Sequence, residues 1–205
     1  KVPSPFDYPA QATLHLPKVS CEPTDKAFTQ MLIDCLPDFI EPAQGNLILF
    51  SSYWQMGEVA KGLRAKGLSL LIQGEASREA LLNLHKSKID GGNGSILMGT
   101  QGLSEGLDLP GNYLTNLIIT KLPFAVPTSP VEEAQAEYVQ KRGGNAFLSI
   151  TVPDASKKLV QSCGRLLRKE QDSGRIVILD RRLISKRYGK AMLDSLPPFK
   201  RQIDY

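Results

Sequence analysis

A short stretch near the carboxyl end of the chain, QSCGRLLR (residues 161–168), combines residue types that bind phosphate. At about 100° per residue, a helix over this stretch places Gln161, Arg165 and Arg168 on one face. Guanidinium groups suit phosphate oxygens because they are planar and always charged. Gly164 borders this face, and a helix-interior glycine, unfavourable by about 1 kcal/mol, makes sense where a ligand approaches the backbone. A solvated basic face is the alternative, and spacing alone does not decide between them.

A second stretch, GTQGLSEGLDLPG (residues 99–111), begins where a predicted strand ends. In open α/β sheets, ligands bind at the carboxyl ends of the strands. Its glycines permit unusual backbone angles and a close approach. A long polar turn on the surface is the competing interpretation. Thr100 and Ser104 offer hydroxyl groups to a ligand, and Glu105 and Asp108 offer carboxylates.

A third stretch, Ser51-Ser52-Tyr53-Trp54, also follows an apolar run of strand length. Small hydroxyl groups suit phosphate contacts, and aromatic rings can stack on nucleic-acid bases. Trp54 is equally typical of an aromatic anchor in the core.

The elements that must position these stretches alternate between strands and helices. Apolar runs predict strands at 12–16, 46–52, 68–72, 95–100, 116–121 and 175–180. Helical spacing predicts helices at 24–36, 55–66, 77–89, 130–142, 155–169 and 181–196. This order indicates an α/β fold with a mainly parallel sheet and helices on both faces, a three-layer αβα arrangement. The stretch 122–153 is longer than an ordinary crossover and is interpreted as an insertion or a partner-contacting element.

The composition narrows the class of protein. The chain has 205 residues, 41% hydrophobic and 22% charged, which is typical of a globular domain. No apolar run approaches the roughly 18 residues of a membrane span. The net charge of +4 is too small to argue for nucleic acid by itself. Cys21, Cys35 and Cys163 lack clustered spacing, so we expect no metal site in this chain and a reducing, cytoplasmic location.

Two classes of nucleotide site are absent from the sequence. No GxxxxGK[ST] phosphate loop occurs, because Gly189-Lys190 is followed by alanine and has no glycine five residues before it. The segment GGNG (91–94) precedes a predicted strand, whereas a dinucleotide-binding loop follows one. A free-standing nucleotide-binding enzyme such as a methyltransferase is therefore disfavoured. His15 and His85 are isolated and are expected to be structural or surface histidines.

The three stretches, in this order, resemble motifs of the second motor domain in superfamily 2 helicases of the DinG/XPD type. LILFSSY resembles motif IV, GTQGLSEGLDLPG resembles motif V, and QSCGRLLR followed by GRIVILDRR resembles motif VI and its following strand. SPFDY near the start and KRYGKAMLDSLPPF near the end fit the same pattern. The resemblance covers residues 1–205 and implies one RecA-like (P-loop NTPase-type) domain.

The resemblance implies an ATP-dependent DNA helicase, moving 5′ to 3′ on single-stranded DNA, in which ATP binds between two RecA-like domains. The phosphate loop, the Mg²⁺ motif and, in many members, an iron–sulfur cluster belong to the N-terminal RecA-like domain. We therefore expect this chain to be half of an active site, inactive as an ATPase alone. Its expected partners are single-stranded DNA and that N-terminal domain of the same polypeptide.

The resemblance also implies residue roles. Arg165 and Arg168 contact the γ-phosphate, and Gln161 helps to place that phosphate or the attacking water. Nucleotide sensing falls to Glu105, Gly106, Asp108 and Gly164. Contacts with the DNA backbone fall to Ser51, Ser52, Tyr53, Thr100 and Gln101. The alternative is a non-catalytic RecA-like module that binds nucleic acid or protein and shows no dependence on the arginines.

Overall fold

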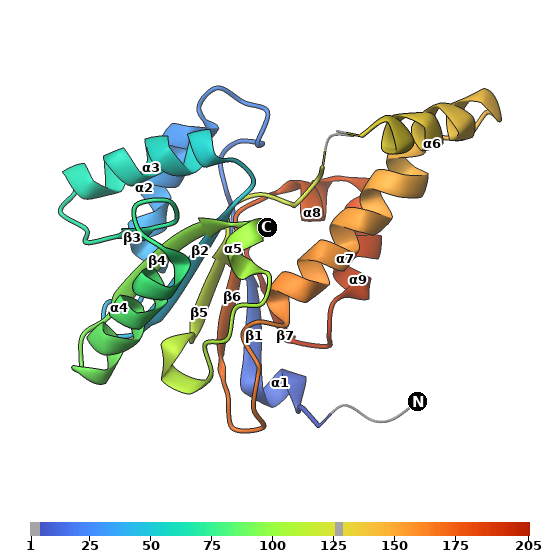
Figure 1. Cartoon of the computed structure of the whole chain (residues 1–205). Coiled ribbons are helices and arrows are strands. Elements are labelled where there is room, and N and C mark those ends of the chain that lie inside the picture. Colours follow the sequence, from blue (N-terminus) through green and yellow to red (C-terminus); the bar gives the residue numbers. More distant parts are fainter. Residues whose placement is uncertain (1–4, 126–128) are drawn as a thin grey trace.

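The computed structural model describes residues 5–125 and 129–205, and its centre is a parallel sheet (Figure 1). Within the described residues the sheet has seven strands in the order β3-β4-β2-β5-β6-β1-β7. All strand pairs run parallel. The strands are β1 (Ala12–Leu16), β2 (Gly45–Phe50), β3 (Leu71–Ile72), β4 (Ser95–Thr100), β5 (Asn116–Ile119), β6 (Gly174–Ile178) and β7 (Lys200–Ile203).

Helices cover both faces of this sheet, because alternate residues of its strands point to opposite sides. In β2, Leu47 and Leu49 pack on one side, whereas Ile48 and Phe50 pack on the other. Helices α2 (Phe28–Phe39) and α3 (Tyr53–Ala65) cover the Ile48 side. Helices α4 (Arg78–Asp90), α7 (Val152–Cys163) and α9 (Arg187–Ser195) cover the Leu47 side. The predicted three-layer αβα arrangement, with a parallel sheet and helices on both faces, is confirmed.

The remaining helical elements lie before or between these strands and helices along the chain. They are α1 (Tyr8–Gln11), α5 (Gln101–Ser104), the 3₁₀ turn η1 (Gly111–Tyr113), α6 (Pro130–Lys141), the π-helical turn η2 (Phe147–Thr151) and α8 (Arg182–Ser185). In Figure 1, α6 stands away from the sheet at the far end of α7. Helix α6 and turn η2 occupy the predicted insertion at 122–153, of which residues 126–128 lie outside the described part. Its role as an insertion or partner contact stays a prediction.

Three predicted helices differ from the structure by three residues or more. The helix predicted at 24–36 is α2, which spans Phe28–Phe39. The helix predicted at 155–169 is α7, which starts at Val152 and ends at Cys163. The helix predicted at 181–196 is divided into α8 and α9 at Lys186, whose backbone is extended. Gly189 lies so close to α8 that an added Cβ would be 2.2 Å from the Leu183 carbonyl oxygen. The compact α8–α9 corner therefore needs glycine at that position.

None of the helices among the described residues has the length and apolar character needed to cross a membrane.

Candidate functional site

The carboxyl ends of β2, β4 and β5 open into a pocket of about 300 Å³, which α7 bounds on one side. The residues that follow these strands meet at one sheet edge because the strands are parallel. All the residues predicted to contact the DNA backbone line this pocket, namely Ser51, Ser52, Tyr53, Thr100 and Gln101. Sequence segments about 50 positions apart thus share one concave surface.

Gln73 links two of these segments. Its Nε2 donates a hydrogen bond to the Tyr53 hydroxyl oxygen at 2.8 Å. Its Oε1 accepts from the backbone N–H of Thr100 at 2.7 Å and from the Thr100 hydroxyl at 3.1 Å. The sequence reasoning missed Gln73, although it directly follows a predicted strand. It holds the start of the Gly99–Gly111 stretch against the start of α3.

The beginning of α3 faces the same pocket. Ser52 caps this helix, since its hydroxyl oxygen accepts the backbone N–H of Gln55 at 3.2 Å. The remaining free N–H groups of a 13-residue helix carry a partial positive charge at this end. Such a terminus favours an anion such as a phosphate.

Two lysines that the sequence reasoning missed also line the pocket, Lys121 after β5 and Lys158 on α7. Burial, and then the charge of Arg182, lower the pKa of Lys121. Arg182 is held in place by an ion pair, in which its Nη2 lies 2.6 Å from Oδ2 of the buried Asp180. With the terminus of α3, the lysines give the pocket a cationic lining.

The arginine segment lies beyond the end of α7 and not on a helical face. Helix α7 ends at Cys163, and Gly164 is its exposed C-cap residue. The predicted stripe of Gln161, Arg165 and Arg168 on one helix is therefore wrong. Gln161 stays on α7, exposed, in a shallow groove with Lys157 and Ser195. Among the described residues, no hydrogen bond joins its side chain to either arginine.

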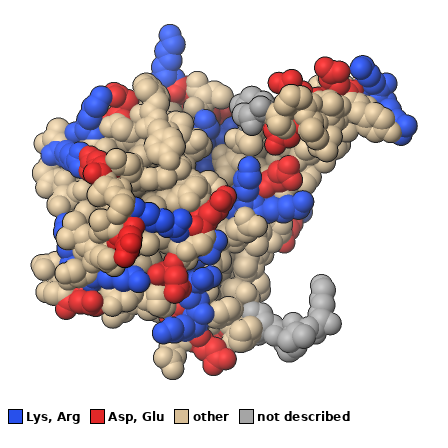
Figure 2. Space-filling view, viewed as in Figure 1, with Lys and Arg blue, Asp and Glu red and all other residues tan. Residues whose placement is uncertain are grey.

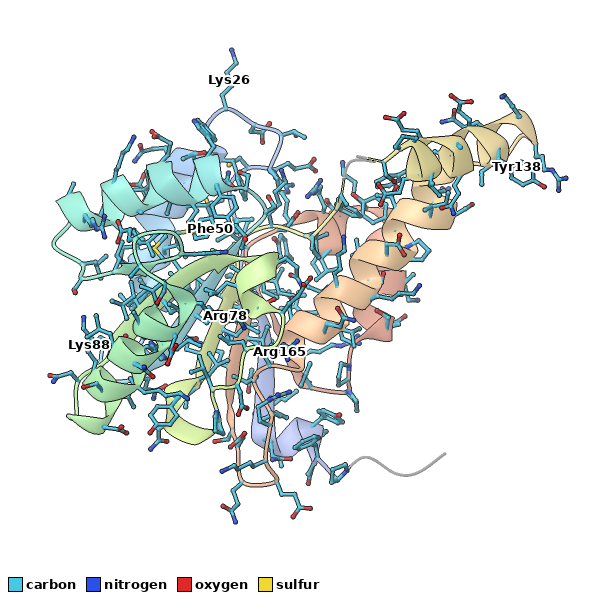
Figure 3. The ribbon with its side chains drawn as sticks, in the orientation of Figure 1. Lys26, Phe50, Arg78, Lys88, Tyr138 and Arg165 are labelled. Atoms are coloured by element: carbon cyan, nitrogen blue, oxygen red, sulfur yellow. The ribbon has the colours of Figure 1, made fainter. Side chains whose placement is uncertain are left out.

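Both arginines nevertheless lie near the loop that contains Glu105 and Asp108, although only Arg168 contacts it directly. Arg168 Nε lies 3.4 Å from Asp108 Oδ1. Burial, then the charges of Arg168 and Arg78, lower the pKa of Arg165, while the Glu105 charge acts in the opposite direction. Arg78 and Arg165 are labelled in Figure 3, at the start of α4 and beyond the end of α7. The structure thus brings together most of the predicted nucleotide-facing residues.

Arg165 is short of partners. Its Nε is buried and, within the described residues, has no hydrogen-bond partner. Nor does any described carboxylate form an ion pair with this side chain. Figure 2 shows that basic and acidic side chains are interspersed over this face, so the unpaired positive charge of Arg165 is not part of a broad basic patch. A partly buried guanidinium without an ion-pair partner is suited to receive an incoming anion.

Asp172, which the sequence reasoning also missed, fixes the backbone of this segment. Its buried Oδ2 accepts the backbone N–H groups of Arg168 and Lys169, each at 2.8 Å. Its Oδ1 accepts the backbone N–H of Gly111 at 3.0 Å. One carboxylate therefore ties the arginine segment to the end of the Gly99–Gly111 stretch. No sequence pattern pointed to it, because its partners are backbone N–H groups, two of them three and four positions away and the third, of Gly111, 61 positions away.

A contact also connects the two parts of the site. The Ser162 hydroxyl, in the last turn of α7, lies 3.0 Å from Gln101 Oε1 and 2.9 Å from the Lys158 carbonyl oxygen. Gln101 lines the pocket, whereas the arginines follow Ser162 by a few residues. As regards metals, the described residues contain no group of three or more His, Cys, Asp or Glu arranged to hold an ion.

Comparison with known proteins gives consistent matches. The helicase C-terminal domain family matches residues 38–199. The ATP-dependent DNA helicase DinG of Photobacterium profundum is 59% identical over 206 residues, which is 98% of this chain and 30% of that protein. The protein of the same name from Escherichia coli (strain K12) is 34% identical over 201 residues, 96% of this chain and 28% of that protein. The chain thus spans less than a third of these relatives.

Solved structures share the fold. Xpd4 of S. tokodaii has a TM-score of 0.66 and 17% identity, with 94% of this chain and 38% of that chain covered. An XPD helicase has a TM-score of 0.65 and 19% identity, with 94% of this chain and 35% of that chain covered. At such identities the likeness concerns the arrangement of strands and helices.

Proposed function

The chain belongs to the helicase C-terminal domain family, and from this premise we propose that it is the second motor domain of an ATP-dependent DNA helicase of the DinG type. The observation that carries the proposal is the closeness of Arg165 and Arg168 to the Glu105–Asp108 loop. In this role the arginines face ATP bound to the N-terminal RecA-like domain of the same polypeptide.

In this role the arginines stabilise the negative charge of the phosphate. Phosphoryl transfer depends mainly on positioning and on neutralising the charge that develops on the transferred phosphate, and an arginine from across an interface contributes roughly 10³–10⁵ in rate. Arg165, with its unpartnered Nε, is the residue best prepared for such an anion. Arg168 is paired with an exposed Asp108 and can exchange that carboxylate for a phosphate oxygen. Glu105 and Gly106 contribute nucleotide sensing through the same loop.

The chain provides only this half of the site. Its sequence has no phosphate loop, so the 205-residue chain alone does not hydrolyse ATP. The phosphate loop, the residues that hold Mg²⁺ and any iron–sulfur cluster belong to the rest of the longer protein. The chain covers 30% and 28% of the length of two DinG relatives, which agrees with this division.

The pocket at the sheet edge is the proposed grip on single-stranded DNA. Ser51, Thr100 and Gln101 offer polar groups to backbone phosphates, and such contacts read no sequence. The terminus of α3 and the two pocket lysines add positive charge, which a polyanion requires. Tyr53, which is 60% exposed, offers a ring on which a base can stack.

Helix α7 couples ATP binding to the grip on DNA. The helix has Ser162, which contacts Gln101 in the DNA pocket, and leads directly into the arginine segment. When ATP draws the arginines toward the other domain, the end of α7 and Gln101 move together. Repeated closing and opening then advances the strand, in the 5′ to 3′ direction that the DinG type implies.

The test uses the full-length helicase. Arg165→Ala and Arg168→Ala are each expected to reduce DNA-stimulated ATP hydrolysis about 10³-fold and to abolish unwinding, with the thermal unfolding temperature unchanged. Lys169→Ala is the matched control, because it removes an exposed charge from the same turn. Normal unwinding by both arginine variants would contradict the proposal and favour a non-catalytic interaction module.

A further inference from the structure

Arg78, the first residue of α4, contacts the loop that contains Glu105 and Gly106. Its Nη2 donates a hydrogen bond to the carbonyl oxygen of Glu105 at 2.6 Å, across 27 positions of sequence. The donor is charged, so the bond is stronger than one between neutral groups. The resemblance and the family match assign no role to this residue.

The carbonyl belongs to a tight turn. Leu107 N–H donates to the Ser104 carbonyl oxygen at 3.2 Å. Glu105 has φ −64° and ψ 122°, and Gly106 has φ +66°, the angles of a type II turn. A positive φ explains why glycine occupies the third position of the turn. The carbonyl between the two central residues points outward from such a turn, and Arg78 binds it there.

Arg78 also adds to the charge around Arg165. The charges of Arg78 and Arg168 both act on the Arg165 guanidinium. The carboxylates that face them are Glu105 and Asp108, on the loop, and among the described residues Asp108 pairs with Arg168 alone. Neither Arg78 nor Arg165 forms an ion pair with a described carboxylate. A charge surplus at one loop is the arrangement expected for a site that awaits a polyphosphate.

We propose that Arg78 is a positioning residue of the nucleotide site, because it holds the Ser104–Leu107 turn beside Arg165. This inference rests on the proposed function, since it names a further residue of the same site. It also predicts which step depends on Arg78. The turn lies at the arginine loop, whereas the DNA pocket is held by Gln73 and Ser162. Loss of Arg78 should therefore weaken the use of ATP and leave DNA binding intact.

The experiment measures DNA-stimulated ATP hydrolysis by the full-length helicase with Arg78→Ala, Arg78→Lys and Lys88→Ala. Lys88 is on the same helix but lies away from Arg165 (Figure 3), and its Nζ is 3.1 Å from the Ser69 hydroxyl. We expect Arg78→Ala to raise KM for ATP about tenfold with a smaller fall in kcat, and Arg78→Lys to give an intermediate KM. Lys88→Ala should behave as wild type, and all variants should bind single-stranded DNA without nucleotide within about twofold of wild type.

The outcomes separate this inference from the proposed function. If Arg165→Ala loses hydrolysis but Arg78→Ala keeps both kinetic constants within about twofold of wild type, Arg78 is an ordinary surface residue and the inference is overturned. A general loss of DNA binding by Arg78→Ala would also overturn it, since the effect would not be confined to the nucleotide. If Arg165→Ala hydrolyses ATP normally, the proposed function fails, and the inference fails with it.

Discussion

Arg168 and Asp108 are 60 positions apart in the sequence, yet Nε of the arginine lies 3.4 Å from Oδ1 of the aspartate. The arginine side chain is 36% exposed and the aspartate side chain 70% exposed. A pair so open to water contributes at most about 1 kcal/mol to stability. The contact therefore holds the arginine near its loop without binding it firmly. In the proposed site, an incoming phosphate replaces the carboxylate at small cost.

Firm positioning comes instead from Asp172, which binds three backbone N–H groups from two loops. Asp172→Ala leaves those three partly buried bonds unmade, so we expect the free energy of unfolding to fall by about 2–4 kcal/mol. Urea denaturation of the 205-residue chain measures this. Asp154→Ala, which removes an exposed carboxylate 3.7 Å from Lys157, should change stability by less than about 0.5 kcal/mol. Equal stability of the two variants would show that Asp172 does not hold the loops.

The two pocket lysines should increase the salt dependence of the affinity for single-stranded DNA. Each contact with a phosphate of single-stranded DNA adds about 0.7 to the slope of log affinity against log salt concentration. Lys121→Ala and Lys158→Ala in the full-length helicase should each weaken binding and reduce that slope by about this amount. The control is Lys61→Ala, an exposed lysine of α3 paired with Glu58 at 2.6 Å. Fluorescence anisotropy with an oligonucleotide measures the slope. Slopes equal to that of the control would remove both lysines from the DNA site.

Much of this site follows from the sequence because it depends on strand ends. The runs at 95–100 and 12–16 match β4 and β1 residue for residue, and the segments after β2 and β4 do meet. The arginine segment was less predictable. Its helical period continues past Gly164, but the chain leaves the helix there and Asp172 binds the backbone beyond it. Periodicity does not register such tertiary hydrogen bonds.

Strand β7 was not predicted from the sequence, for a different reason. Its residues Lys200–Ile203 are all exposed and show no alternation of polar and apolar side chains. It forms the sheet edge beside β1, where charged residues discourage pairing with other chains. His15 of β1 and Asp204 contribute a contact of 2.6 Å between Nε2 and Oδ2 just beyond this strand. The strand is thus specified by its neighbours rather than by its own sequence.

The buried His85 predicts a dependence of stability on pH. Its Nε2 lies 2.7 Å from the Tyr113 carbonyl oxygen and its Nδ1 2.9 Å from the Ser95 hydroxyl, which suits the neutral ring. Burial lowers its pKa from 6.5, so the unfolded chain binds a proton more readily than the folded chain. The stabilisation is present above about pH 6.5 and is lost as the pH falls below it.

Urea denaturation between about pH 7.5 and pH 5.5 tests this dependence, since that window lies above the ordinary range of carboxylates. The free energy of unfolding of the wild-type chain should fall toward the acid end. His85→Gln should be less stable at neutral pH but should show a flatter pH profile. Parallel profiles for the two proteins would mean that His85 does not titrate on unfolding.

We propose that this chain supplies arginines to an ATP site whose phosphate-binding half lies in another domain. The most direct measurement is DNA-stimulated ATP hydrolysis by the purified 205-residue chain, shown to be folded by circular dichroism, beside the full-length helicase. We predict background turnover by the chain and steady turnover by the full-length protein. Hydrolysis by the chain alone at the rate of the full-length protein would contradict the claim.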